Sequence, residues 1–359
     1  MCPCVAVIKT ETLRCYWILV QIIWRMNAIL KAIAGLLFFC NGIIACKGQP
    51  VTGLNQLKLE KTILLPGVKG RIDHLDFNIK SKIVYIAALG NNSLEIADIV
   101  NGKIIHSITG LDEPQGVSYI PQTNEIFVAN GGNGDCYFFN AVSFDKTGTV
   151  HLSSDADDTR YDSAGQKIYA GYGNGAIAVI DAVMHKQTGD IKLPAHPEGF
   201  QLNTKTKQLF VNVPDAHCIG IIDLVQSKLI NKWESTYSAN FPLAIDTINN
   251  HLFVGYRHPA KLVVLDAMTG KQISVGDMAG DADDLYYDYK TGQVYVSCGS
   301  GYINIFRQQG SAVYKQIANI ATSNGARTSL LIPSLQLFIV AQRAESGNPA
   351  QLSIYDIMP

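Results

Sequence analysis

An aromatic residue recurs about every 42 residues through most of this 359-residue chain, and this period constrains the fold more than any other feature. Successive copies are separated by 42, 42, 41, 43, 42 and 43 residues, and β-branched or small apolar residues flank each one. The copies are Tyr85, Phe127, Tyr169, Phe210, Phe253, Tyr295 and Phe338. The chain therefore contains seven repeats of one unit.

The unit is clearest in residues 74–108, where four short runs of β-type residues are separated by Lys-Ser, Gly-Asn-Asn and Asn-Gly turn signals. One such meander cannot bury both of its faces, so it must be sandwiched between neighbours. A period near forty with four strands per unit is typical of a β-propeller blade. We therefore predict an all-β fold over residues 56–359, a seven-bladed β-propeller of four-stranded antiparallel blades.

The two ends of the repeat region complement each other. The seventh unit begins at Arg327 and ends at Ile357 after only three strands, whereas residues 56–65 alternate like a strand but precede the first unit. We predict that this N-terminal strand completes the last blade, which closes the ring and removes a free sheet edge.

The charge and cysteine content exclude several functional classes. A net charge of -1, a pI near 6.7 and the absence of a Lys/Arg run argue against binding to nucleic acid or to an anionic membrane surface. Five of the eight cysteines fall in the first fifty residues. The other three, Cys136, Cys218 and Cys298, are too far apart in the predicted ring to pair, so we expect free and mostly buried thiols.

The N-terminal residues have the composition of an export signal. Residues 26–45 carry one Lys near their start, then a short apolar run and small residues, which is typical of a signal peptide. The tetrapeptide Ile43-Ile44-Ala45-Cys46 resembles the bacterial lipobox, in which the cysteine becomes the lipidated first residue. We expect an exported, periplasmic or cell-surface protein, lipid-anchored through Cys46, with residues 46–55 as a linker.

Two other interpretations of the N-terminal region stay open. Residues 1–25 are an overextended N-terminus if translation starts at Met26. An uncleaved anchor over residues 16–45 is the alternative to a cleaved signal, and Arg25, Asn27 and Lys31 in its middle count against it.

The strand sequences resemble a known family. Runs such as Tyr85-Ile-Ala-Ala and Phe127-Val-Ala-Asn are followed by a Gly/Asn turn and then by a strand that ends in Asp, as in Leu94-Glu-Ile-Ala-Asp98. Over about residues 56–357 this pattern is similar to the YncE-like, or YVTN-repeat, family of exported seven-bladed propellers, although a literal Tyr-Val-Thr-Asn is absent. Members of that family are mostly periplasmic or surface proteins without an established reaction. The resemblance therefore implies a fold and a compartment rather than an activity.

Acidic residues gather where the innermost strand of each blade begins, which in a propeller is one mouth of the central channel. Blades three and six carry the same tetrapeptide, Asp155-Ala-Asp-Asp158 and Asp281-Ala-Asp-Asp284, and they lie nearly half a turn apart. We expect the two to face each other across the channel with basic residues between them. The predicted ligand-binding residues are Arg71, Asp73, His74, Glu113, Asp157, Asp158, His196, Glu198, Asp283, Asp284 and Arg327.

Such a mouth suits several ligands. Oxygen-rich sites favour a hard divalent cation such as Ca²⁺, with Asp157 and Asp283 as its ligands. They also suit a polyhydroxylated or cationic molecule held by charge-assisted hydrogen bonds. A purely structural role is equally open, because Asp before a strand commonly accepts hydrogen bonds from turn backbone. Most aromatic residues are expected in the core, with Tyr172 and Tyr256 as the exposed pair.

These observations predict a monomeric propeller that binds a small molecule, a glycan or a protein partner at the acidic channel mouth. The alternative is a divalent-cation-dependent hydrolase or lactonase with its site at the same mouth, where the cation would polarise a carbonyl and activate water. A third hypothesis is that the blades only stiffen an envelope assembly. No GxSxG or HExxH motif is present to favour an enzyme.

Overall fold

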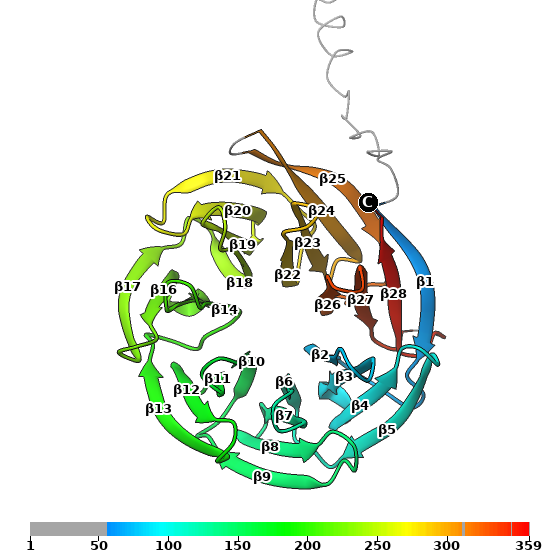
Figure 1. Ribbon diagram of the computed structural model, residues 1–359. Helices are drawn as coiled ribbons and strands as arrows, with labels where there is room; N and C mark the ends of the chain where they lie inside the picture. Colours follow the sequence, from blue (N-terminus) through cyan, green and yellow to red (C-terminus); the bar gives the residue numbers. More distant parts are fainter. Residues whose placement is uncertain (1–55, 311–312, 346, 359) are drawn as a thin grey trace, which may run out of the picture. The chain divides into compact units, whose positions relative to one another are not determined.

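The computed structural model describes residues 56–310, 313–345 and 347–358, and in this part of the chain seven four-stranded antiparallel sheets are arranged in a ring (Figure 1). The seven-bladed β-propeller prediction is thus confirmed. Two single-turn 3₁₀ segments, Leu89–Asn91 and Pro214–Ala216, are the helical elements among these residues. No helix in the described ranges is long and apolar enough to cross a membrane. The predicted signal peptide and lipobox lie outside the described residues.

Each blade has one strand at the channel and three successive strands toward the rim (Figure 1). The innermost strands are β2 (Leu75–Asn78), β6 (Pro114–Ile120), β10 (Ala156–Asp162), β14 (Phe200–Asn203), β18 (Ser238–Asp246), β22 (Ala282–Asp288) and β26 (Ser329–Ile332). The second strands are β3 (Ile83–Ala88), β7 (Glu125–Asn130), β11 (Lys167–Tyr172), β15 (Gln208–Val213), β19 (His251–His258), β23 (Gln293–Cys298) and β27 (Leu337–Gln342).

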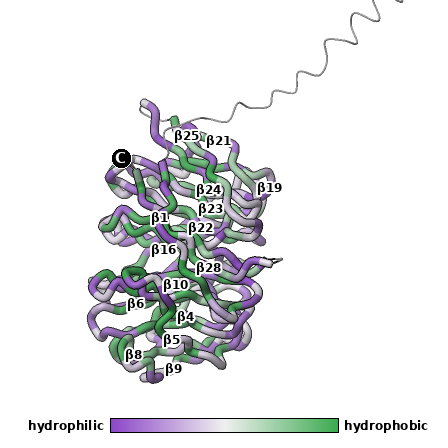
Figure 2. The backbone as a smooth tube through the Cα atoms, turned by 90° about the vertical axis from the view of Figure 1, so that its right-hand side faces the viewer, coloured by the Kyte–Doolittle hydropathy of each residue, from purple (hydrophilic) through white to green (hydrophobic). Residues whose placement is uncertain are grey.

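The rim strand of each blade is its most exposed strand, whereas the third strand is mostly buried. The third strands are β4 (Ser93–Asp98), β8 (Asp135–Asn140), β12 (Ala176–Asp181), β16 (Cys218–Asp223), β20 (Ala260–Asp266), β24 (Tyr302–Gln309) and β28 (Gln351–Ile357). The rim strands are β5 (Lys103–Thr109), β9 (Lys146–His151), β13 (Lys186–Lys192), β17 (Lys228–Glu234), β21 (Gln272–Asp277), β25 (Val313–Ala321) and β1 (Leu57–Leu64). Figure 2 shows the propeller from the side, with green hydrophobic stretches in the blades and purple hydrophilic stretches in many of the loops.

The ring is closed as predicted by the N-terminal strand. Strand β1 pairs antiparallel with β28, in a register that runs from Leu57 opposite Ile357 to Leu64 opposite Gln351. In Figure 1 the blue β1 therefore lies beside the red β28. A second tie joins the same ends of the ring, because the Thr328 hydroxyl donates to the carbonyl of Ile72 at 3.2 Å.

The periodic aromatic residue is the centre of the core between blades. All seven copies are nearly inaccessible, with exposed fractions from 0% to 3%, so they pack one sheet onto the next. The expectation for Tyr172 and Tyr256 was wrong, since they are only 9% and 1% exposed. Their rings pack in the inter-blade core because the second strand of every blade is covered on both faces. The three cysteines of the described chain are free and buried, as expected.

The Asp that ends several third strands has a turn function. In four blades its Oδ1 accepts backbone N–H groups two and three residues later, at 2.8 to 3.0 Å, in an Asx-type turn. These residues are Asp98, Asp181, Asp223 and Asp266. The acidic residues at the starts of the innermost strands instead face charged side chains of other blades.

Candidate functional site

The two Asp-Ala-Asp-Asp segments meet at the channel through His74. Its Nε2 lies 3.9 Å from Asp157 and 4.0 Å from Asp158 of blade three, and its Nδ1 lies 3.5 Å from Asp284 of blade six. Asp73, the residue before it, is 3.6 Å from Nε2. The sequence prediction that the two segments face each other with His74 between them therefore agrees with the geometry.

This position strongly favours the imidazolium form of His74. Burial by itself lowers the pKa of the imidazole, but the negative charges of Asp158, Asp284 and Asp73 more than offset burial and raise it well above 6.5. The strand pattern explains the placement, because each of these residues lies at the start of an innermost strand, where the chain turns into the channel. His74 thus acts as a cation shared by three blades.

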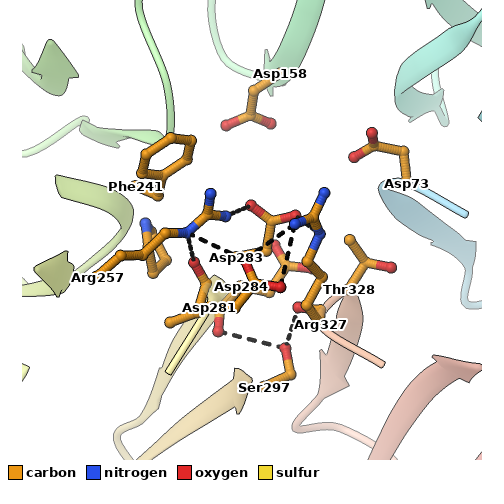
Figure 3. Close-up of polar contacts among 12 residues, drawn as sticks. Asp73, Asp158, Phe241, Arg257, Asp281, Asp283, Asp284, Ser297, Arg327 and Thr328 are labelled. Atoms are coloured by element: carbon orange, nitrogen blue, oxygen red, sulfur yellow. Dashed lines mark hydrogen bonds and ion pairs between the residues drawn. The ribbon is translucent and has the colours of Figure 1, made fainter. Parts of the chain in front are cut away.

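Blade six forms a second ionic cluster, drawn in Figure 3. Asp283 accepts from Arg257 Nη2 at 2.5 Å and pairs with Arg327 Nε at 2.8 Å, and Asp281 pairs with Arg327 Nη1 at 3.0 Å. The Arg257 guanidinium also lies 3.5 Å from the ring centre of Phe241. Asp281 and Asp283 of this tetrapeptide are therefore held between two arginines from the neighbouring blades on either side (Figure 3).

Sequence reasoning did not find Arg257, although it is central to this cluster. It stands at the end of β19, where the corresponding segments of four other blades have Gly or Asn turns. That departure from the repeat was the available signal. Arg160 on β10 was also missed; it pairs with Asp158 inside the channel. An arginine in an innermost strand, at a position facing the channel, was the corresponding signal.

His196 and Glu198 from the segment before β14 complete the mouth. His196 Nδ1 donates to the Gly173 carbonyl at 2.6 Å, and its Nε2 lies 3.8 Å from Asp157. Burial opposes protonation of His196, but Asp157, the Gly173 carbonyl and Asp155 raise its pKa to about 9. The same imidazolium, with His74 and Arg71, lowers the pKa of Asp157 against the effect of burial.

Two other predicted residues behave differently. Arg71 Nη2 pairs with Asp73 Oδ2 at 2.6 Å, so it belongs to the channel cluster. Glu113 is exposed, has a positive φ of 52°, and its backbone N–H donates to Asn92 Oδ1. No ion pair joins Glu113 to the cluster in the described chain, so the geometry brings together the predicted residues other than this one.

The clustered carboxylates outnumber the cations. Eight carboxylates lie around six cationic groups when both histidines are protonated: Asp73, Asp155, Asp157, Asp158, Glu198, Asp281, Asp283 and Asp284, with Arg71, Arg160, Arg257, Arg327, His74 and His196. Two carboxylates respond with raised pKa values. Burial, then the charges of Asp157 and Asp283, raise that of Glu198 to about 8. Burial also raises that of Asp73 to about 7.

The channel has two openings separated by these ionic residues. At the side where the innermost strands begin, a cavity of about 800 Å³ is lined by Asp155, His196, Glu198, Phe241 and Arg257, among others, and we call it the near pocket. Deeper in, between His74, Asp157 and Asp283, the space shrinks to about 20 Å³, room for one water molecule. A polar ligand entering the near pocket would therefore meet the carboxylates directly.

Three side chains have the arrangement of a metal site. The ligand atoms of Asp73, His74 and Asp157 lie within 4.8 Å of one another. Asp284 faces the other nitrogen of His74, and in metal centres a carboxylate in this place orients the histidine ring toward the metal. By contrast Asp283, the other residue expected to bind a cation, is occupied by Arg257 and Arg327.

Comparison with known proteins separates fold from function. No protein-family model matches the chain, and no curated protein matches it by sequence. Among solved structures, 1860 chains match. One of them belongs to a structure described as "Crystal Structure of Mitotic Checkpoint Complex", with a TM-score of 0.71 and 17% identity over 84% of this chain and 92% of that one. At this identity the similarity shows the fold alone: the chain is a β-propeller.

Proposed function

We propose that this chain is a binding propeller whose near pocket takes a cationic group, an ammonium or guanidinium, on a small molecule or a protein partner. The observation that carries the proposal is the excess of carboxylates, together with the raised pKa of Glu198. A carboxylate stays partly protonated near neutral pH when too few cations lie near it to stabilise its ionised form. A ligand cation would supply that charge and release the proton.

The size of the near pocket favours an organic ligand over a bare ion. Its volume of about 800 Å³ lies within the roughly 300–1,000 Å³ that small-molecule sites occupy. Phe241 provides an aromatic surface at its edge, although Arg257 already stacks on that ring. The ligand group would therefore approach Glu198 and Asp155 from the open side.

Isothermal titration of the purified chain with putrescine and with L-arginine, in two buffers of different ionisation enthalpy at pH 7.5, tests this proposal. We expect binding with net proton release, and Glu198→Gln should weaken it about tenfold and abolish the release. Glu113→Gln is the matched control, because that exposed glutamate lies at the same mouth but outside the cluster. Absence of binding by either cation, or unchanged proton release in Glu198→Gln, would overturn the proposal.

A metal-dependent hydrolase or lactonase is the second candidate, and the Asp73–His74–Asp157 geometry is the observation that favours it. These residues fit a divalent cation once His74 loses its proton, and such a cation would polarise a carbonyl and activate water. Metal analysis of the purified chain, with lactone and ester assays before and after chelation, tests this function. Metal-free protein without chelator-sensitive turnover would eliminate it.

We also propose export and lipid anchoring at Cys46, supported by the apolar run and small residues of residues 26–45. YncE-like membership belongs to the same proposal, supported by the strand and turn pattern of the seven units. Fractionation of a bacterial host labelled with a palmitate analogue should place the label in the membrane fraction. Cys46→Ser should lose the label, and a cytoplasmic, unlabelled wild-type chain would contradict the proposal.

A further inference from the structure

The channel contains a second cavity beyond the ionic residues, opening toward the opposite face of the ring. It holds about 470 Å³ and is lined by the middle and far ends of the innermost strands of six blades. We call it the far chamber and define it by Asp76, Phe77, Ser118, Arg160, Tyr161 and Gln201. Its volume is again within the range of small-molecule pockets. Of the residues predicted from the sequence to bind a ligand, His74, Asp158 and Asp284 line its inner end, and the other lining residues were not predicted.

Arg160 supplies fixed donors inside the far chamber. Its Nη1 donates to Asp158 and to the Thr159 carbonyl, the latter at 2.8 Å. Its Nε and Nη2 make no hydrogen bond to any described residue, and the side chain keeps 28% exposure although it projects into the channel. Because the bond to the buried Asp158 fixes the guanidinium, these two donors are preorganised for a ligand.

Acceptors lie in the same space. Asp76 accepts the N–H of Phe77 at 2.8 Å with one oxygen and that of Tyr119 at 2.6 Å with the other, so its orientation is fixed while each oxygen keeps a free lone pair. Gln201 is half-buried, and its amide makes no hydrogen bond within the described part of the chain. The chamber thus offers a carboxylate, a guanidinium and an amide to a single bound molecule.

The charges that line the far chamber are balanced, whereas the channel cluster taken as a whole has more carboxylates than cations. Three carboxylates line it, Asp76, Asp158 and Asp284, and so do three cations, Arg160, His74 and Lys80. The carboxylates would repel a bound anion, and Arg160 would repel a bound cation. For either kind of ion, the attraction inside the chamber would therefore not offset the cost of removing it from water. A neutral molecule with many hydroxyl groups can instead use both kinds of partner.

The chamber walls are aromatic, and their hydroxyl groups are already bonded elsewhere. Tyr161 donates to Gln122 at 2.8 Å, Tyr119 to Asn124 at 2.8 Å, and Tyr286 to the Ser329 carbonyl at 2.7 Å. These residues therefore offer ring carbon rather than hydroxyl groups. The C–H face of a sugar ring packs against such surfaces while its hydroxyls bond to the polar groups.

We propose that the far chamber is a carbohydrate site that takes a neutral sugar ring, with vicinal hydroxyls bridging Asp76 and Arg160 and one ring face on Tyr161. The site is separate from the cation site of the near pocket, because Glu198 and His196 do not line it.

A glycan array that displays neutral and uronic- or sialic-acid-containing glycans, probed with the labelled full chain, tests the proposal, and titration with the free sugar measures each neutral hit. We expect neutral glycans to bind. Tyr161→Leu and Gln201→Leu should each weaken binding, and Arg160→Met should weaken it at least about tenfold. Tyr161→Phe keeps the ring and loses only the bond to Gln122, so it should bind like the wild type.

The outcomes are distinguishable from those at the near pocket. Glu198→Gln should leave sugar binding unchanged while it alters the response to putrescine. Since Arg160→Met removes the arginine that pairs with the buried Asp158 and can unfold the chain, the two leucine variants keep the test decisive. No neutral glycan bound, a preference for acidic glycans, or full binding by Tyr161→Leu would each overturn the proposal.

Discussion

Replacing Glu198 with Gln should change the pH dependence of stability in a defined direction. The folded-state pKa of Glu198 is raised from 4.5 to about 8, so between these values the native state binds a proton that the unfolded state has lost. The contribution of Glu198 to the unfolding free energy is therefore fully present below about pH 4.5, and it is lost as the pH rises toward 8. Glutamine keeps the size of the side chain and cannot ionise.

The magnitude follows from the same pKa. A rise from 4.5 to about 8 corresponds to roughly 5 kcal/mol between the two protonation states, and partial exposure reduces this to about 2 kcal/mol. We therefore expect Glu198→Gln to be similar to the wild type in unfolding free energy at pH 5 and about 2 kcal/mol more stable at pH 9.

Urea denaturation at pH 5, 7 and 9, followed by tyrosine fluorescence or circular dichroism, measures this difference. Glu113→Gln is again the control, since that side chain is exposed and its replacement should leave the pH profile unchanged. If Glu198→Gln and the wild type lose stability in parallel from pH 5 to 9, the inferred crowding of carboxylates around Glu198 is incorrect.

Three further predictions concern the ring and its ionic cluster. Deleting residues 56–64 removes β1 and exposes the edge of β28, so the chain should lose its cooperative unfolding transition in calorimetry; an unchanged melting temperature would disprove closure by β1. Arg257→Ala leaves the buried Asp283 paired with Arg327 alone and should lower the unfolding free energy in urea by about 3 kcal/mol, whereas a loss below roughly 0.5 kcal/mol, the size expected of an exposed pair, would contradict this geometry. Cys136, Cys218 and Cys298 should resist alkylation by iodoacetamide until urea unfolds the protein, as measured by peptide mass spectrometry that separates them from the five cysteines of residues 1–50, and rapid alkylation of these three in the native form would show that the blades are looser than described.

The repeat was sufficient to predict the architecture because its information is local. A buried aromatic every 42 residues or so, strand-ending Asp residues and a missing last strand each describe one blade or one end of the chain. Identical blades can pack around an axis in few ways, so the number of units determined the ring. The start of each innermost strand also followed from the alignment of units, which located His74 and both acidic tetrapeptides.

Only the tertiary structure decided which charges meet. Arg257 and Arg160 enter the cluster from positions where other blades carry different residues, and the repeat gave no reason to aim them at Asp283 and Asp158. The far chamber likewise combines side chains of six blades. Sequence alone determined the blades and their number, because period and alternation act within about 40 residues. The partners of each charge depend on distances across the channel between residues far apart in the chain, and these exist only once the ring has closed.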